Sequence, residues 1–535
     1  MQLTLPFAVL LTTILALYSV SEVDAHPLAK ARAPNGRITL PLKRVVRRTD
    51  VHPEVYLQQH LNRAHRRYAR MTGREEPSTE ALTRALEKRV ASIEARGLQV
   101  RSGRLGYAAQ GMTSSALVNV AEPGKGKNKG NGTAAAAGAA GAAAGAGAAT
   151  AAGAGAATAA GTGAAAAAAA GTAAASGANT GNAGFPAASA QAAASNSLAQ
   201  ANTPTTANSV GLDIEANDVS YVSTVQLGTP PKNFNVIMDS GSADFWVAGD
   251  NCQTCAGHQL LGASTSSSFV DTQQPFSVTY GSGNVQGNIV TDTLTLAGLT
   301  LTNHTFGTAT AESAQFAQDP NSDGLMGLAQ STLSSQGVLT PVESLAQQGL
   351  ISNAITSFKI SRLADQKNDG EVTFGALDTT KFDSTTLVTL NNVNTQGFWE
   401  VNVGGFSVNG QDVGLAGRTA IMDTGTTLII APPADAQALM SAVPGAQSDG
   451  QGGFTVPCTT NATIALTLGG TTFNVDPRDL AFLPTTNNLA GNCVAGVSSG
   501  QIGGATEWLV GDVFLKNAYF STDVAKNQIS FAKLI

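Results

Sequence analysis

A short polar loop with one carboxylate occurs twice in this chain of 535 residues, each time between two apolar runs. The first copy, Asp239-Ser240-Gly241-Ser242, lies between residues 234–238 and 245–247. The second, Asp423-Thr424-Gly425-Thr426, begins 184 positions later in a similar setting. Each copy is typical of two buried strands joined by a tight turn that glycine allows. One copy alone would more often be a turn than a site, whereas two framed copies indicate a duplicated functional loop.

The chain from residue 206 onward reads as β-rich. Residues 221–228 alternate like a strand, Thr229-Pro230-Pro231 turns the chain, and similar short strands recur to the end. Helical patterns are few and cover residues 342–349, 434–443 and 478–483. This pattern predicts an all-β protein with two sandwich-like or barrel-like lobes, at residues 206–395 and 396–535. One Asp motif in each lobe implies an internal duplication with a cleft between the halves.

Charge is distributed unevenly along the chain. Residues 26–104 hold 18 Lys and Arg against 7 Asp and Glu, whereas residues 201–535 hold 10 against 27. A basic segment joined to an acidic domain favours mutual attraction over a nucleic-acid partner. The acidic region has no basic patch, so we expect no nucleic acid to bind there.

Three segments precede the lobes. Residues 1–25 read as a secretory signal, because residues 5–20 are mostly apolar and small residues follow up to Ala25. A membrane anchor is the rival interpretation, but the apolar run is short and is interrupted by hydroxyl residues. Residues 26–104 form the basic segment, with helical patterns at 56–69 and 80–94. Residues 105–205 are a linker rich in Ala and Gly that has little to pack into a core.

The four cysteines form a close pair, Cys252 and Cys255, and a distant pair, Cys458 and Cys493. Four cysteines in the acidic region fit an oxidising compartment. The close pair also matches a thiol-redox site or half of a zinc site, although no βαβ pattern or second close pair supports either. We therefore expect no metal.

Further motifs follow the Asp loops in a defined order. Tyr280-Gly281-Ser282-Gly283 begins 41 residues after Asp239, and two elements of the type apolar-apolar-Gly occur at 323–328 and 508–512. Together with the twin Asp loops, they resemble the pepsin-like aspartic proteases in their fungal secreted form. The resemblance covers residues 212–535 and implies the bilobal pepsin-like acid protease fold.

The resemblance also assigns roles to residues. Asp239 and Asp423 would be catalytic, and the loops would be braced by Ser240, Gly241, Ser242, Thr424, Gly425 and Thr426. A flap over the substrate would contain Tyr280, Gly281 and Ser282, with Trp246 steadying the tyrosine. An apolar pocket would be formed by Ile237, Phe316 and Leu325. The disulfides implied are Cys252–Cys255 and Cys458–Cys493.

The chemistry implied is hydrolysis without a cofactor or a covalent intermediate. Two carboxylates that share one proton cannot both ionise easily, and aspartic proteases are the standard example of this effect. Asp239 would be the ionised base that activates a water, and Asp423 would donate to the scissile carbonyl oxygen. The function expected is that of a secreted aspartic endopeptidase, made as a zymogen and active at acidic pH, which prefers large apolar residues at the cut.

The basic segment resembles the propeptide of the family, beginning with a first strand at residues 37–44. It would act as an intramolecular inhibitor, with Lys43, Arg66 or Arg67 paired to the catalytic carboxylates, and acid would loosen it. Lys88-Arg89 reads as an exposed dibasic processing site, with Arg47-Arg48 and Arg66-Arg67 as rivals. The alternative is a solvated basic helix without an inhibitory role.

Three sequons, at Asn131, Asn303 and Asn461, are acceptors for N-glycosylation if exposed. The partners expected are protein or peptide substrates, and the chain is expected to be a monomer that is secreted rather than vacuolar, with no membrane partner. A non-catalytic protein of the same fold that binds another protein is an alternative, as is a glycosidase with paired carboxylates. A homodimeric viral-type protease is disfavoured because both halves lie in one chain.

Overall fold

The computed structural model describes residues 52–71, 77–96, 198–280, 283–317, 319–486, 488–500 and 504–535. The expected signal, the expected propeptide strand with Lys43, the sequon at Asn131 and most of the linker therefore lie outside the described residues. Gly281 and Ser282, which the sequence places in a flap, lie outside them as well.

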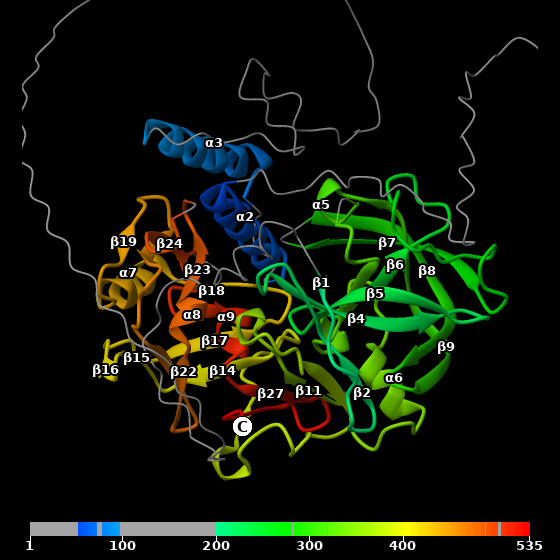
Figure 1. The fold of residues 1–535 in the computed structure, drawn as a ribbon. Helices are drawn as coiled ribbons and strands as arrows, with labels where there is room; N and C mark the ends of the chain where they lie inside the picture. Colours follow the sequence, from blue (N-terminus) through cyan, green and yellow to red (C-terminus); the bar gives the residue numbers. More distant parts are fainter. Residues whose placement is uncertain are drawn as a thin grey trace, which may run out of the picture. The chain divides into compact units, whose positions relative to one another are not determined.

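The first half of the described domain is built on one large sheet (Figure 1, cyan and green). Its nine strands run in the order β1 (Leu198–Ala199), β3 (Asp213–Glu215), β4 (Ser220–Leu227), β5 (Lys232–Asp239), β10 (Gly324–Gly327), β6 (Phe245–Ala248), β9 (Leu299–Glu312), β8 (Gly283–Leu296) and β7 (Val270–Tyr280). Strands β7 and β8 pair as an antiparallel hairpin up to Tyr280 and Gly283.

Most strands of the second half belong to three smaller sheets (Figure 1, yellow to red). The first has the order β14 (Glu400–Val403), β17 (Arg418–Met422), β26 (Glu507–Val510), β18 (Ile429–Ala431), β25 (Val497–Ser499). The second has the order β16 (Gln411–Asp412), β15 (Gly405–Val408), β21 (Ile464–Leu468), β22 (Thr471–Val475). The third has the order β19 (Gln447–Ser448), β20 (Phe454–Pro457), β24 (Asn492–Ala495), β23 (Ala481–Pro484).

A six-stranded sheet takes strands from both halves. Its order is β13 (Val388–Asn391), β28 (Gln528–Ala532), β27 (Tyr519–Asp523), β11 (Ile355–Lys359), β12 (Glu371–Phe374), β2 (Ser209–Gly211). The last strands of the chain thus pair with strands of the first half, so the halves share a common base. The expected all-β fold is confirmed.

Helices are short and few among the described residues of the β-rich region. They are α5 (Ala314–Ala317), α6 (Pro341–Gln347), α7 (Pro433–Ser441), α8 (Pro477–Leu480) and α9 (Asp512–Leu515), with single 3₁₀ turns at Ser331–Leu333, Leu363–Asp365 and Ser384–Thr386. The structure has helices at two of the predicted sites, as α6 and α7. The third prediction, residues 478–483, was only partly right, because α8 ends at Leu480 and strand β23 follows.

Two longer helices precede the sheets, α2 (Pro53–Met71) and α3 (Thr79–Ala95), and they overlap the two helical patterns expected in the basic segment. Helix α3 is capped at its N-terminus by Ser78, whose hydroxyl accepts a hydrogen bond from the Ala81 amide at 3.1 Å. Strand β1 also precedes the expected lobe boundary at residue 206, since Leu198 pairs with Glu215 and Ala199 with Ile214. Residues 198 and 199, assigned to the linker from the sequence, therefore belong to the sheet.

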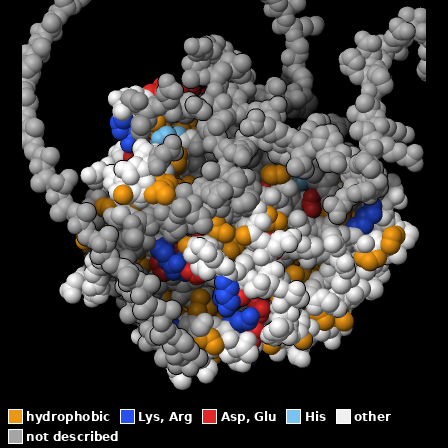
Figure 2. Space-filling model, viewed as in Figure 1, with side chains coloured by type: hydrophobic (Ala, Val, Ile, Leu, Met, Phe, Trp, Pro, Cys, Tyr) orange, Lys and Arg blue, Asp and Glu red, His pale blue; other side chains and the backbone are white. Residues whose placement is uncertain are grey.

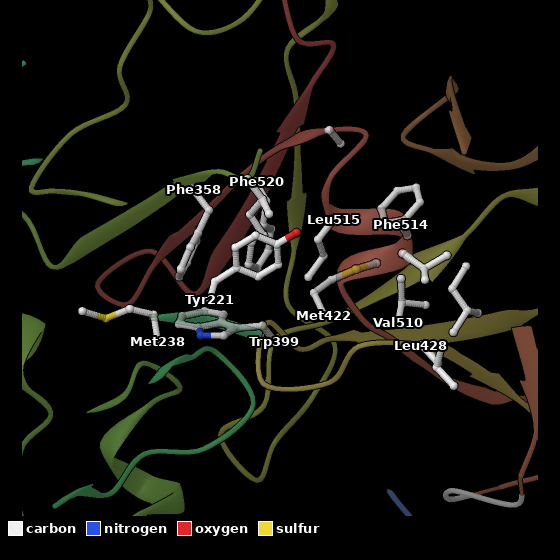
Figure 3. Packing of buried hydrophobic residues seen from close by; sticks show 14 of the residues in the cluster. Tyr221, Met238, Phe358, Trp399, Met422, Leu428, Val510, Phe514, Leu515 and Phe520 are labelled. Carbon is white, nitrogen blue, oxygen red and sulfur yellow. The ribbon is translucent and has the colours of Figure 1, made fainter. Parts of the chain in front are cut away.

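The main apolar core includes the residues that immediately precede the two Asp loops. Met238 and Met422, which immediately precede Asp239 and Asp423, are 1% and 0% exposed. Figure 3 shows both methionines in one packed group with Trp399 and Tyr221. The Trp399 indole donates to the Leu328 carbonyl at 3.0 Å, so this large side chain is held in a fixed orientation. The strand ends that lead into both loops are therefore held by close packing in the core.

Charged side chains are sparse, at 13% of the chain, and the coloured part of the face in Figure 2 shows a few blue and red groups among white and orange areas. Several charges are instead buried in a network that joins the halves. Arg362 donates to Asp479 at 2.8 and 2.6 Å, and the Lys516 ammonium lies 2.9 Å from carboxylate oxygens of both Asp479 and Asp218. Burial opposes ionisation of Asp479, yet Arg362 and Lys516 hold the pKa of its carboxyl well below its usual range.

Replacing Asp479 by Ala leaves two buried cations without their shared partner. We expect Asp479→Ala to lower the free energy of unfolding by about 3 to 5 kcal/mol, measured by urea denaturation. The control is Lys367→Ala, since Lys367 is 69% exposed in its pair with Asp369, and its effect should stay within about 0.5 kcal/mol. Equal effects of the two substitutions would contradict the central role of the buried network.

Candidate active site

The two Asp loops are positioned by the same arrangement of strands in each half. In the first half, β10 runs parallel to β5 and antiparallel to β6, with Gly327 opposite Asp239. In the second half, β26 runs parallel to β17 and antiparallel to β18, with Val510 opposite Met422. The strand from each apolar-apolar-Gly element therefore lies between the two strands that flank an Asp loop.

Glycine is required where these strands pass the loops. A Cβ atom at Gly327 would lie 2.5 Å from the Ala243 carbonyl carbon, and one at Gly511 would overlap the Thr426 carbonyl oxygen. The close passage allows backbone hydrogen bonds at the loops, from the Leu328 amide to the Asp239 carbonyl at 2.8 Å and from the Asp423 amide to the Val510 carbonyl at 3.0 Å. Glycine at these positions is thus a packing requirement.

The loops are joined to each other by reciprocal hydrogen bonds between Ser240 and Thr424. The Ser240 amide donates to the Thr424 hydroxyl at 2.9 Å, and the Thr424 amide donates to the Ser240 hydroxyl at 3.0 Å. Each hydroxyl then donates across to the other half, Ser240 to the Met422 carbonyl at 3.0 Å and Thr424 to the Met238 carbonyl at 2.7 Å. All four bonds are buried, and they bring the residues next to Asp239 and Asp423 into contact.

Each carboxylate receives the same two donors from its own loop. Asp239 accepts from the Gly241 amide at 2.9 Å and the Ser242 hydroxyl at 2.6 Å. Asp423 accepts from the Gly425 amide at 2.9 Å and the Thr426 hydroxyl at 2.7 Å. Both aspartates are 0% exposed. Paired donors of this kind fix the orientation of a carboxylate.

The hairpin of β7 and β8 places Tyr280 beside the first Asp loop. The Trp246 indole donates to the Tyr280 hydroxyl at 2.8 Å, and the ring of Phe316 meets both aromatic rings edge-on, at 5.2 and 5.5 Å. The same apolar cluster includes Leu325 and the partly buried Ile237. All three residues expected in an apolar pocket therefore lie in, or pack against, the cluster that contains the tyrosine of the hairpin.

A profile of the eukaryotic aspartyl proteases matches residues 220–534. The chain belongs to this family. It is 35% identical over 335 residues to a probable aspartic-type endopeptidase CTSD of Arthroderma benhamiae, across 62% of this chain and 64% of that protein. It is also 35% identical to the aspartic-type endopeptidase ctsD of Aspergillus fumigatus, across 62% of this chain and 69% of that protein. It is 33% identical to the embryonic pepsinogen of Gallus gallus, across 59% of this chain and 81% of that protein. The match to the Arthroderma protein thus spans less than two thirds of its length.

A third carboxyl lies near the pair, and sequence reasoning missed its role. Asp512, in the element next to the second loop, is 1% exposed, and neither of its oxygens has a hydrogen-bond partner among the described residues. Burial raises the pKa of Asp512 well above its usual value, and the negative charges of Asp423, Asp218 and Asp239 add to this effect while Lys516 opposes it. Only its place in the 508–512 motif was visible in the sequence.

Both disulfides are present, Cys252–Cys255 and Cys458–Cys493. Cys252, Cys255 and Glu312 lie close enough to suggest metal ligands, but the bonded sulfurs cannot act as thiolates.

The described sequon asparagines, Asn303 and Asn461, are both exposed. Within the described part of the chain, no helix combines the length and apolar character needed to cross a membrane.

Glu312 ends strand β9, opposite Val285 of the β7–β8 hairpin, and is 6% exposed. Its Oε1 lies 2.9 Å from the Cys255 sulfur, and because a disulfide sulfur carries no hydrogen, only a protonated Glu312 can donate there. Burial raises the pKa of Glu312 to about 7, with the charge of Asp323 adding to the rise and His258 opposing it. The buried carboxyl is therefore neutral in acid.

Replacing Ser240 by Ala removes the acceptor of the Thr424 amide and leaves that buried N–H unpaired. We expect Ser240→Ala to lower the free energy of unfolding by about 1 to 3 kcal/mol, measured by urea denaturation. Ser240→Thr keeps the hydroxyl and should remain close to the parent protein. A Thr variant as unstable as the Ala variant would show that side-chain volume, rather than the hydroxyl, matters here.

Glu312 should make the fold less stable as pH rises. Below the usual glutamate pKa both folded and unfolded states are protonated; between that value and about 7 the unfolded state ionises first, so stability is lost through this window. Glu312→Gln stays neutral, so its melting temperature should match the parent at pH 4 and exceed it by a few degrees at pH 7. An equal difference at both pH values would contradict this assignment.

Proposed function

We propose that this protein is an aspartic endopeptidase, made as a zymogen and secreted, that hydrolyses peptide bonds of proteins at acidic pH. The observation that carries the proposal is the reciprocal pairing of Ser240 with Thr424. It joins two loops whose carboxylates each have one amide and one hydroxyl donor, and this is the arrangement that two cooperating acids require. The relatives named as aspartic-type endopeptidases support the same activity.

In the proposed reaction, Asp239 is ionised and removes a proton from a water that attacks the scissile carbonyl carbon. Asp423 is protonated and donates to the carbonyl oxygen, so a tetrahedral diol forms. Collapse of the diol then transfers a proton to the leaving amine. Gly241, Ser242, Gly425 and Thr426 orient the two carboxylates, and no covalent intermediate is needed.

The proposed substrate preference is for large apolar residues beside the cut. It rests on the cluster of Ile237, Phe316 and Leu325 around Tyr280, which offers an apolar wall next to the first Asp loop. The flap formed by Tyr280, Gly281 and Ser282 would close over the bound peptide, with Trp246 holding the tyrosine hydroxyl.

Residues 26–104 are proposed as the propeptide and as an intramolecular inhibitor. In support, helix α2 lies against β7, a strand of the flap hairpin, and against β24 in the second half. The signal-like residues 1–25, the two disulfides and the exposed sequons at Asn303 and Asn461 support passage through the oxidising secretory pathway, and secretion is the destination proposed. A monomer is proposed because both Asp loops belong to one chain.

The test is cleavage of denatured haemoglobin by the processed protein from pH 2.5 to 7.5, with and without pepstatin. We expect activity that peaks in acid, is abolished by pepstatin, and falls by roughly a thousandfold or more in Asp423→Asn. The surface variant Asp412→Asn is the control and should keep full activity. If folded, processed protein cleaves nothing at any pH, the enzyme proposal fails in favour of a binding protein of the same fold.

A further inference from the structure

The helical hairpin of α2 and α3 packs against the catalytic domain, where α2 contacts β7 of the first half and β24 of the second. Leu57 and Leu61 on α2 are 2% and 1% exposed and belong to the same apolar cluster as the domain core. Two glycines allow this close approach, since a Cβ at Gly453 would lie 2.7 Å from Leu57 and one at Gly500 would lie 2.7 Å from His65. The hairpin is therefore docked by close contact along one face of α2.

Arg89 on α3 is the charged centre of this contact. Its side chain is 0% exposed, and a buried guanidinium needs partners for its donors. It is paired with the Asp449 carboxylate, donates to the Gln451 carbonyl at 3.0 Å, and donates twice to Gln58 Oε1 on α2, at 2.9 and 3.2 Å. Burial lowers the pKa of Arg89 to about 10, so it stays cationic in acid and at neutrality.

The receiving loop is built around the same carboxylate. The other oxygen of Asp449 accepts from the Gln451 amide at 2.7 Å and the Gly453 amide at 2.9 Å. The Gln451 side chain in turn donates to the Lys88 carbonyl at 3.4 Å. Residues 449–453 thus hold both the side chain of Arg89 and the backbone beside it.

These contacts correct the sequence-based view of Lys88-Arg89 as an exposed dibasic site. Lys88 is exposed, but Arg89 is fully buried and both residues lie inside helix α3. A processing protease must unfold the helix locally and take the arginine side chain into its own pocket. The rate of such cleavage follows the population of the open form.

We propose that Lys88-Arg89 is a conditional processing site, in which Arg89 latches the helical hairpin to Asp449 and so protects its own peptide bond until the hairpin leaves the domain. The inference rests on the proposed function, because it treats residues 26–104 as a propeptide. During maturation, the hairpin therefore leaves the domain first, and cleavage at Lys88-Arg89 follows.

The experiment uses the full chain carrying Asp423→Asn, so that self-cleavage does not contribute. Trypsin is added in trace amount at pH 7.5, and cleavage after Arg89 is followed by mass spectrometry. Asp449→Asn keeps the shape of the side chain and the acceptor for the loop amides but removes the charge that pairs with Arg89. Leu61→Ala weakens the apolar docking without touching the latch. Gln59→Ala, on the same helix, is the matched control.

We expect cleavage after Arg89 to be at least about tenfold faster in Asp449→Asn and in Leu61→Ala, because each raises the undocked population. Gln59→Ala should stay within about twofold of the parent. The latch is refuted if Leu61→Ala is cut faster while Asp449→Asn is cut at the parent rate, and the whole proposal is refuted if neither variant differs from the parent. The added protease makes the result independent of the chain's own peptidase activity, so failure here and failure of the proposed function are separate outcomes.

Discussion

Four buried hydrogen bonds between the Ser240 and Thr424 loops hold the site together, and the surrounding structure serves to maintain them. The loops come from strands β5 and β17, which belong to different sheets, so no strand pairing joins the two loops directly and these bonds bring them into contact. Each amide donates to the hydroxyl of the opposite loop, and each hydroxyl donates to a carbonyl of the opposite loop, so these buried groups all have partners. A shift of either half would leave buried polar groups unpaired.

The parts of the site that depend on local sequence were predictable. Asp-hydroxyl-Gly-hydroxyl contains both the acid and the donors that orient it, because the Gly amide and the second hydroxyl lie two and three residues after the aspartate. The all-β character followed from short alternating runs and frequent turn residues. Helix α8 was overestimated in length because residues 481–483 are apolar in either secondary structure, and pairing with β24 decided in favour of a strand.

The parts that depend on distant residues were not predictable. In the sequence, Asp512 is the last residue of a structural motif. Only the structure shows that it is buried close enough to Asp239 and Asp423 for their charges to raise its pKa. Arg89 looked like a solvated cation beside another, because its carboxylate partner lies 360 residues away in the sequence. The spacing of charges along a chain shows neither whether a basic side chain is buried nor which acidic residue it pairs with. The exposure of basic motifs in a docked segment is therefore easily misjudged from sequence alone.

The sheet shared by the two halves has a consequence for how the chain is made. Ser357 in β11 and Ser521 in β27, 164 residues apart, are joined by a hydrogen bond at 2.8 Å in its interior. During synthesis, one edge of β11 therefore stays unpaired until β27, near the end of the chain, has been made. Such an edge is prone to pair with other chains. Contacts of this sequence separation also slow folding. The interval between synthesis of the first half and arrival of the final strands is the stage at which this protein is most exposed to misassembly.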